Sequence, residues 1–264
     1  MKQRIITGVI AGLVFISLLV LGDLWYAGLI VLVSVIGYRE YLQMNGYMPY
    51  KLTSAAGLIA LLCITIPWGL LGITMTISFS AIVWFAMFIL LFVTVASKNK
   101  ITIDQVSVIL LGVVYIGFGF NYMIEARLAD NGLFWTIMVF ICIWASDAGA
   151  YFVGSKLGKT PLWPQISPKK SVEGAIGGVI IAMMFAVGFA WYAPDLLSIS
   201  KALWLGFLIA VVGQLGDLIQ SAYKRVKGIK DTGTLLPGHG GVLDRMDSWL
   251  IVFPFIYLLG LIPN

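Results

Sequence analysis

The chain has 264 residues, of which 60% are hydrophobic and only 11% are charged. A soluble domain carries about 25% charged residues, and a soluble core of this length could not bury so much apolar surface. The net charge of +5 does not indicate nucleic acid as a partner, because the basic residues lie in short segments between apolar runs, where membrane topology places them. The composition predicts an all-α, polytopic integral membrane protein whose solvent is the lipid bilayer.

Nine apolar runs are long enough to cross a bilayer, since a spanning helix needs about 20 mostly apolar residues. In chain order they are 5–22, 24–42, 54–72, 74–97, 103–124, 132–154, 173–193, 202–225 and 246–262. The first run follows two basic residues, as a signal peptide would, but no small-residue cleavage site follows it, so we expect a retained span. The runs 54–72 and 246–262 are the weakest, because Pro67 and Pro254 interrupt them.

The positive charges predict how the chain is oriented. With the N-terminus in the cytoplasm, only Arg127 and Lys201 of the 17 Lys and Arg residues fall on the outer side. Such a bias is the positive-inside pattern. It also supports the number of spans, because one helix more or fewer would move every later loop to the other side. We therefore expect a cytoplasmic N-terminus and an outer C-terminus.

The two parts of the chain differ in polarity. Residues 1–140 are apolar runs with brief connections, and they predict a scaffold of transmembrane helices. Residues 141–264 add three polar insertions on the predicted cytoplasmic side, and they predict the catalytic part. Cys63 and Cys142 lie within apolar runs without metal-ligand spacing, so we expect them to be small core residues.

The first polar insertion covers residues 144–174. Asp147 falls in the last third of a predicted span, where an ionised carboxylate is costly and usually functional. The segment SPKK, 167–170, leads directly into a new helix start beside Glu173, and helix N-termini attract phosphate. The predicted phosphate-binding side chains are Ser167, Lys169 and Lys170. For the earlier lysines, Lys156 and Lys159, contact with anionic lipid headgroups is the alternative.

The second insertion lies within the span 202–225. Gln214, Asp217 and Ser221 are spaced by three and four residues, so they share one face of the helix. Asp217 precedes Lys224 by seven residues, which places it about 10 Å below the basic end of the helix. An intramembrane carboxylate is functional by default, and a simple pairing with another helix is the structural alternative.

The third insertion, 221–247, has the highest density of charge. Its basic residues are Lys224, Arg225, Lys227, Lys230 and Arg245, and its acidic residues are Asp231, Asp244 and Asp247. Between them lies the glycine-rich segment PGHGG, 237–241, with the chain's one histidine, His239. A single loop histidine is more often structural or solvated than catalytic. Asp244 and Asp247 are three residues apart at the start of the last span, so we expect both to point the same way.

Carboxylates without a Cys or His cluster favour a hard ion that prefers oxygen ligands, and beside phosphates Mg²⁺ is the usual one. Basic groups, carboxylates and a flexible glycine segment together predict a site for a polyphosphate–Mg²⁺ substrate. A purely electrostatic membrane anchor would not need the aspartates.

The segment from Ser221 to Asp247 resembles the signature of the phosphatidate cytidylyltransferases, also called CDP-diacylglycerol synthases. That pattern runs Ser, two residues, Lys-Arg, four residues, Lys-Asp, then Pro-x-His-Gly-Gly and finally Asp-Arg-x-Asp. The matching residues are Ser221, Lys224, Arg225, Lys230, Asp231, Pro237, His239, Gly240, Gly241, Asp244, Arg245 and Asp247. Tyr223 departs from it, because an aliphatic residue or Phe usually stands there. The SPKKSVEG segment and the Asp147 helix also resemble upstream blocks of the family.

The resemblance implies transfer of CMP from CTP to phosphatidic acid at the cytoplasmic face of a bacterial inner membrane, with CDP-diacylglycerol and pyrophosphate as products. It implies Mg²⁺ as the cofactor, with two metal ions or a second monovalent cation as alternatives to a single ion, and a homodimer as the assembly. The implied metal ligands are Asp217 and Asp244, then Asp147 and Asp247, with Asp231 and Glu173 as further candidates.

The remaining roles are expectations of the same kind. The implied catalytic residues are Lys224, Arg225, Lys230 and Arg245 on the CTP phosphates, with Asp231 and His239. The implied substrate-binding residues are Lys169 and Lys170 on the phosphatidate phosphate or the leaving pyrophosphate, Ser167 and Ser221, and the backbone N–H groups of Gly240 and Gly241. An ionised phosphate is its own nucleophile, so a general base is not obligatory.

Two other functions fit part of the pattern. A transporter would also place carboxylates such as Asp147 and Asp217 inside the membrane, but a transport path needs polar groups in the outer half as well. A CTP-dependent transferase acting on another lipid phosphate is the nearer alternative. The paired-aspartate motif of the CDP-alcohol phosphotransferases and the Asp-rich motif of the membrane prenyltransferases are both absent from the sequence.

Overall fold

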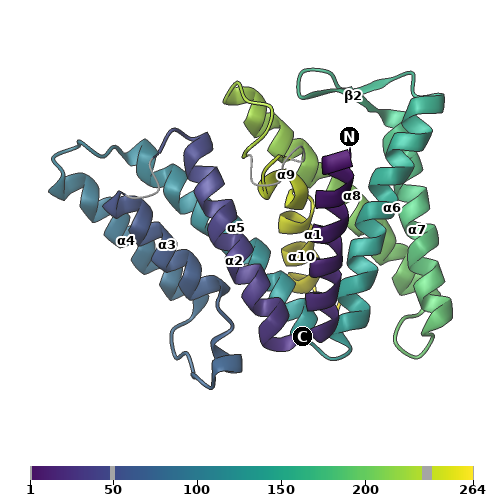
Figure 1. The fold of residues 1–264 in the computed structure, drawn as a ribbon, viewed down its shortest axis with the longest axis horizontal. Coiled ribbons are helices and arrows are strands. Elements are labelled where there is room, and N and C mark those ends of the chain that lie inside the picture. The colour runs from purple at the N-terminus through teal and green to yellow at the C-terminus, as the bar shows by residue number, and fades with distance from the viewer. Residues whose placement is uncertain (1, 48–50, 234–239, 264) are drawn as a thin grey trace. The chain divides into compact units, whose positions relative to one another are not determined.

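The computed structural model describes residues 2–47, 51–233 and 240–263 (Figure 1). The chain forms two compact units, each made of two stretches of sequence. Unit 1 comprises residues 1–128 and 231–245, and unit 2 comprises residues 129–230 and 246–264. Nearly all regular structure in both units is helical, in agreement with the predicted all-α class. The predicted division of the chain at residue 140 into a scaffold and a catalytic part stays a prediction.

Unit 1 is built around α5. Its elements are α1 (Lys2–Leu21), α2 (Asp23–Met44), α3 (Leu52–Thr65), the 3₁₀ helix η1 (Trp68–Leu71), α4 (Phe79–Ala96) and α5 (Ile103–Leu128). Helix α5 packs against α2, α3 and α4. The α2–α5 contact is close because Gly112 leaves room for the ring of Tyr41, whose hydroxyl donates to the Val108 carbonyl at 3.0 Å. This contact holds the C-terminal part of α2 in a defined position.

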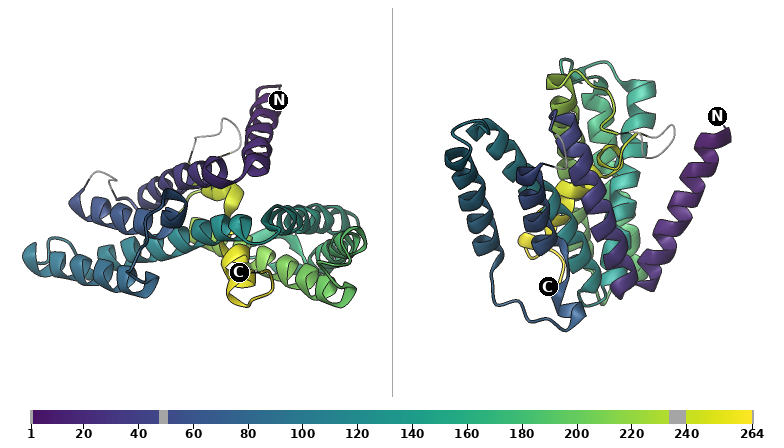
Figure 2. Two further views of the ribbon diagram at one scale, coloured as in Figure 1. Left: turned by 90° about the horizontal axis from the view of Figure 1, so that it is seen from below. Right: turned by 60° about the vertical axis from the view of Figure 1, so that its left-hand side comes forward.

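Helix α1 meets α2 at Gly22 and diverges from it beyond this junction (Figure 2). Gly22 has a φ of 73°, a left-handed conformation that glycine adopts without steric cost. The Arg127 side chain of α5 donates to the carbonyls of Leu19 at 2.9 Å and Val20 at 3.3 Å. It therefore satisfies carbonyl groups that the last turn of α1 leaves without helical partners.

Unit 2 contains α6 (Gly132–Leu157), β1 (Pro161–Trp163), β2 (Ser167–Ser171), α7 (Val172–Tyr192), α8 (Ile199–Val226) and α10 (Trp249–Leu258). Helices α6 and α7 lie side by side, with the β1–β2 hairpin at one end of the pair (Figure 1). Glycines allow this close packing, since a Cβ added to Gly174 would lie 3.0 Å from the Gly154 Cα. Helix α10 packs on α6 through rings, with Phe140 and Trp249 centroids 4.6 Å apart.

The sequence did not indicate the hairpin, which is the only strand pair in the described part of the chain. The helix start expected after SPKK is confirmed, because α7 begins at Val172. The Ser171 hydroxyl accepts from the Gly174 N–H at 3.1 Å and caps the helix. The Glu173 carboxylate accepts from the N–H groups of Lys159 at 3.1 Å and Thr160 at 3.2 Å. Glu173 thus fixes the loop that precedes the hairpin.

Five helices within the described ranges are long and apolar enough to cross a membrane, and the protein is a multi-pass membrane protein. They are α4, α5, α6, α7 and α8. Further apolar helical stretches are Gly8–Leu21 within α1, Leu52–Thr65 and Trp249–Leu258. In the run 54–72 the α-helix α3 ends at Thr65, before Pro67, since proline removes a backbone donor, and the 3₁₀ helix η1 follows. The run 246–262 does not form one continuous helix, because α9 (Leu243–Met246) ends before a turn at 247–248.

Candidate active site

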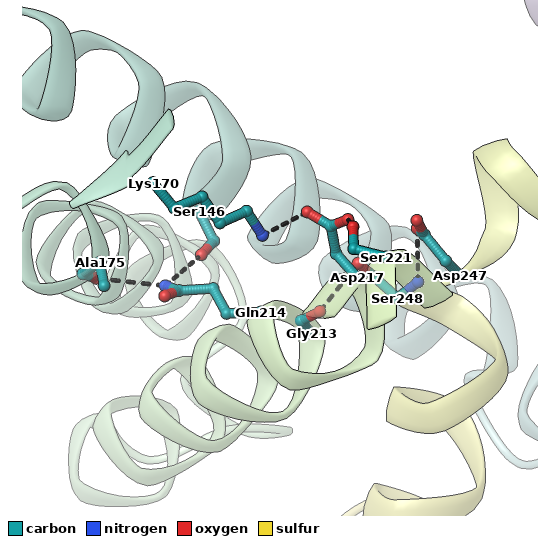
Figure 3. A network of polar contacts seen from close by, with 9 residues as sticks. All are labelled: Ser146, Lys170, Ala175, Gly213, Gln214, Asp217, Ser221, Asp247 and Ser248. Carbon is teal, nitrogen blue, oxygen red and sulfur yellow. Dashed lines mark hydrogen bonds and ion pairs between the residues drawn. The ribbon is translucent and has the colours of Figure 1, made fainter. Parts of the chain in front are cut away.

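A cluster of charged side chains lies in unit 2, where α6, β2 and α8 come together (Figure 3). At its centre, Asp217 of α8 forms an ion pair through Oδ2 with the Lys170 ammonium of β2. The other carboxylate oxygen, Oδ1, accepts from the Ser221 hydroxyl at 3.3 Å. The side chains of Lys170 and Asp217 are 30% and 32% exposed. The pair is therefore held in place but remains accessible to a ligand.

Two more carboxylates belong to the cluster. Asp147 of α6 interacts electrostatically with Asp217 and with Lys170. Asp247, just before α10, interacts electrostatically with Asp217, Asp147 and Lys224, and its Oδ1 accepts from the Ser248 N–H at 2.8 Å. Three carboxylates and two ammonium groups thus act on one another, although they come from four separate segments of the chain. We call these five residues the carboxylate cluster.

A layer of polar contacts holds the elements that carry the cluster. The Gln214 amide donates to the Ser146 hydroxyl at 3.3 Å and to the Ala175 carbonyl at 3.1 Å, which ties α8 to α6 and α7 (Figure 3). The Ser248 hydroxyl donates to the Gly213 carbonyl at 2.9 Å and ties the start of α10 to α8. Each of these side chains lies one to three positions from a cluster carboxylate or on the same helix.

The residues suit Mg²⁺ carried by a polyphosphate. Within the described ranges, no three Asp, Glu, His or Cys side chains converge as a ready-made metal cage. Mg²⁺ does not need one, because it usually binds through one or two carboxylates and completes its coordination with waters and substrate phosphates. The cluster supplies this kind of surface. Its carboxylate oxygens can ligate a hard cation, and the ammonium groups of Lys170 and Lys224 can hold phosphate oxygens.

Other predicted phosphate-binding residues also belong to unit 2. Arg225, at the end of α8, donates through Nε to the Ile166 carbonyl at 3.1 Å and so ties α8 to the hairpin. Ser167 and Lys169 lie on β2 with Lys170, and Lys169 is exposed. Lys230, the last residue of the stretch 129–230 of unit 2, is exposed. The hairpin therefore presents the lysines that the sequence predicted beside a helix start.

Unit 1 contains the remaining signature residues. Asp244 accepts through Oδ2 from the Thr232 N–H at 2.7 Å, the Thr232 hydroxyl at 3.0 Å and the Gly241 N–H at 3.0 Å. Gly240 adopts a φ of 85°, and an added Cβ would lie 2.7 Å from the same Asp244 oxygen. The Asp244 carboxylate therefore holds the turn at Gly240 and Gly241 in place through its hydrogen bond to the Gly241 N–H. Asp231 and Arg245 are both exposed.

The common direction expected for Asp244 and Asp247 stays a prediction, but their place at the start of one helix needs a correction. Asp244 lies within the four-residue α9, whereas Asp247 lies in the turn that follows. The two carboxylates are not on one continuous helix, and spacing alone does not align them. His239 and Pro237 lie outside the described residues.

One buried acid that the sequence reasoning missed contacts the signature. Glu40 of α2, only 5% exposed, accepts from the Val242 N–H at 3.0 Å and the Leu243 N–H at 3.1 Å. The run 1–140 was expected to contain no chemistry. Glu40 stands near the end of the predicted span 24–42, where charged residues are common, so the rule that identified Asp147 and Asp217 did not single it out.

The chain matches the cytidylyltransferase family over residues 2–262. A phosphatidate cytidylyltransferase of Bacillus subtilis (strain 168) is 44% identical to it over 267 residues, which cover 98% of this chain and 97% of that protein. The phosphatidate cytidylyltransferases of Staphylococcus haemolyticus (strain JCSC1435) and Staphylococcus aureus (strain COL) are 37% and 35% identical, each over 98% of both chains. The match extends over both units, so the resemblance first noticed in 221–247 holds for the whole chain, and the protein is a member of the cytidylyltransferase family.

Proposed function

We propose that this protein is an enzyme that transfers CMP from CTP to phosphatidic acid, giving CDP-diacylglycerol and pyrophosphate for phospholipid synthesis. Its relatives carry the name of this activity over their full length. The observation that supports the proposal in the structure is the carboxylate cluster, in which acids and lysines lie together and remain partly accessible. Such an arrangement suits a metal-bound triphosphate better than a membrane anchor.

The reaction brings two anions together. A phosphate oxygen of phosphatidic acid attacks the α-phosphorus of CTP, and the bond from that phosphorus to the oxygen bridging the β-phosphate breaks. Pyrophosphate leaves with the electron pair of that bond. The repulsion between the anions dominates the barrier, and fixed positive groups lower it most where negative charge develops. Lys170 and Lys224 are the cations of the cluster that would hold the phosphates in unit 2.

The proposal includes Mg²⁺, which when bound would neutralise phosphate charge and orient the phosphates. Asp217, with Asp147 and Asp247, would hold it in unit 2. Asp244 stays a predicted ligand, and its Oδ2 already accepts three hydrogen bonds within unit 1. In the proposed reaction the lipid phosphate needs no general base, so the chain's own task is to bind, orient and neutralise.

The finer topology is also part of the proposal. We propose nine spans, with the N-terminus in the cytoplasm and the C-terminus outside. The C-terminal end of α6, the hairpin and the basic end of α8 would then face the cytoplasm, where CTP is dissolved. Phosphatidic acid would reach the same surface laterally from the membrane. A homodimer is proposed on the family resemblance alone, and the mass of the purified protein in detergent measures it.

One assay tests the reaction. The purified protein in lipid nanodiscs is given labelled CTP and Mg²⁺ with phosphatidic acid, diacylglycerol or an isoprenoid phosphate, and both lipid product and pyrophosphate are followed. We expect equal amounts of labelled lipid and pyrophosphate with phosphatidic acid only. Turnover with the isoprenoid phosphate alone would support the alternative, a CTP-dependent transferase that acts on another lipid phosphate. Labelled product from none of the three would refute the proposed function.

A further inference from the structure

We propose that Glu40 is a positioning residue for the signature turn, defined here as residues 240–244. This inference rests on the proposed function, because it takes the signature turn to contact the nucleotide or its metal. Glu40 lies on α2, 202 positions before Val242 in the sequence. Every contact that carries the argument lies within unit 1.

Both oxygens of the Glu40 carboxylate accept hydrogen bonds from the turn or from Thr232. Oε1 accepts from the Val242 N–H at 3.0 Å. Oε2 accepts from the Leu243 N–H at 3.1 Å and from the Thr232 hydroxyl at 3.4 Å. Burying a carboxylate is costly unless charged hydrogen bonds compensate for lost water. Two adjacent backbone donors on two different oxygens provide such compensation and fix the direction of the turn.

The link continues from Glu40 to Asp244. Thr232, which is 6% exposed, shares its hydroxyl between Glu40 and the Oδ2 of Asp244, at 3.4 and 3.0 Å. Asp244 in turn accepts from the Gly241 N–H at 3.0 Å. Glu40 therefore acts on Asp244 by two routes, through the backbone of the turn and through Thr232. Neither route requires Glu40 itself to touch a substrate.

Close packing makes the position exacting. A Cβ added to Gly241 would contact the Oε2 of Glu40 below normal separation, and one added to Gly233 would lie 2.5 Å from its Oε1. The carboxylate thus occupies the space that side chains at both glycines would take. Gly241 of the signature is therefore needed for the close approach of an acid from α2, in addition to any approach of a ligand.

The substitution Glu40→Gln tests whether Glu40 acts through the hydrogen bonds of its carboxylate or only through the volume of its side chain. Glutamine keeps the size, but it offers one acceptor oxygen and an NH₂ group in place of two acceptors. One of the two N–H groups, of Val242 or of Leu243, then faces a donor and loses its bond. A hydrogen bond to a charged group is worth enough that we expect hydrogen exchange at the amide that loses its bond to rise about 10-fold or more.

The kinetic measurement compares the KM for CTP with the KM for phosphatidic acid. We expect Glu40→Gln to raise the KM for CTP and the Mg²⁺ concentration for half-maximal rate by about 10–100-fold, with the KM for phosphatidic acid within about twofold of the wild type. The matched control is Glu125→Gln, which neutralises a half-buried acid of α5 in the same unit. This control should leave both exchange and both KM values within about twofold.

A second variant covers the case in which Glu40→Gln does not fold. Thr232→Val keeps the shape of the side chain and removes only the hydroxyl between Glu40 and Asp244. We expect it to raise the CTP KM and the Mg²⁺ requirement by about 3–10-fold, with unchanged exchange at Val242 and Leu243. A normal CTP KM in this variant would overturn the inference if the Gln variant cannot be purified.

The outcomes keep the two proposals apart. If folded Glu40→Gln shows wild-type exchange at Val242 and Leu243, Glu40 does not hold the turn and the inference is wrong. Faster exchange with an unchanged CTP KM would likewise refute the positioning role. If the wild-type protein makes no CDP-diacylglycerol, the proposed function fails, and the exchange comparison still decides whether Glu40 holds the turn.

Discussion

Asp217 is the residue on which most of the candidate site depends, because its two oxygens bind Lys170 and Ser221 and its charge acts on both Asp147 and Asp247. Asp217→Asn keeps the shape and removes the charge. We expect kcat for CTP turnover with phosphatidic acid to fall about 100-fold or more. The control Asp104→Asn, in the exposed first turn of α5, should retain wild-type turnover. Near-normal turnover in purified Asp217→Asn would contradict the role given to this carboxylate.

The ion pair between Lys170 and Asp217 can be tested by a double-mutant cycle. Lys170→Met removes the ammonium and keeps most of the chain length. We expect each single variant to reduce kcat/KM, and the double variant to lose less than the product of the two single losses, because residues in contact are not additive. Initial rates at varied CTP concentrations measure the coupling. Strictly multiplicative losses would show that the two side chains act independently during catalysis.

At the residue scale, the sequence predicted the members of the cluster but not their partners. Asp147 and Asp217 were expected from their place in apolar runs and Asp247 from the charged segment 221–247, and unit 2 brings them within electrostatic range. Glu40 was missed, since it falls near the end of an apolar run, where a charge is unremarkable. Its importance comes from contacts with Val242 and Leu243, and nothing in a local pattern indicates so distant a partner.

At the scale of elements, hydropathy predicted where helices exist better than where they end. The runs 132–154 and 173–193 correspond to α6 and α7 within a few residues. The β1–β2 hairpin was not predicted, because strands of three and five residues are too short for a periodic signal. The run 246–262 was predicted as one helix, yet the chain turns at 247–248. That turn places Asp247 and Ser248, whose contacts with α8 only the structure could show.

The close contact between α6 and α7 leads to a prediction about stability. A Cβ at Gly178 would lie 2.6 Å from the Ser146 carbonyl oxygen, whereas one at Gly188 on the same helix meets nothing within 4 Å. We therefore expect Gly178→Ala to destabilise the protein by about 1–3 kcal/mol. Gly188→Ala should leave stability unchanged or raise it by up to about 1 kcal/mol, because alanine favours the helix. Unfolding of both variants in one detergent measures the difference.

Gly178→Ala should also reduce activity, since Ser146 holds the Gln214 amide beneath the carboxylate cluster. If the two alanine variants unfold alike and turn over CTP alike, the α6–α7 contact does not constrain the site. A loss of stability with full activity would show that the packing of α6 against α7 stabilises the protein but does not determine the position of Asp147.

At the scale of the whole molecule, the signature is continuous in sequence and divided in structure. Residues 221–230 belong to unit 2, residues 231–245 to unit 1, and the chain returns to unit 2 after that. Spacing along the chain identified the family motif, but it could not show that Asp217 and Asp244 have their contacts in different units. The chain passes between the units more than once, and no composition shift in the sequence marks these passages.

The proposed orientation is a property of the whole chain, and cysteine labelling tests it. In a Cys63→Ala/Cys142→Ala background, Asp195→Cys lies in the exposed connection between α7 and α8, and Lys100→Cys lies in the exposed connection between α4 and α5. The positive-inside pattern places the first outside and the second in the cytoplasm. An impermeant maleimide should therefore label position 195 in intact cells and position 100 only after permeabilisation.

A third position tests the number of spans. Nine spans place the C-terminus on the side opposite the N-terminus, so Pro263→Cys should react in intact cells as position 195 does. Labelling of position 195 with protection of position 263 would mean that α10, a helix of 10 residues, does not carry the chain across the membrane. The reverse labelling pattern at positions 195 and 100 would mean that the protein has the opposite orientation in the membrane. The carboxylate cluster would then face away from cytoplasmic CTP, and the proposed reaction would lose its access to the nucleotide.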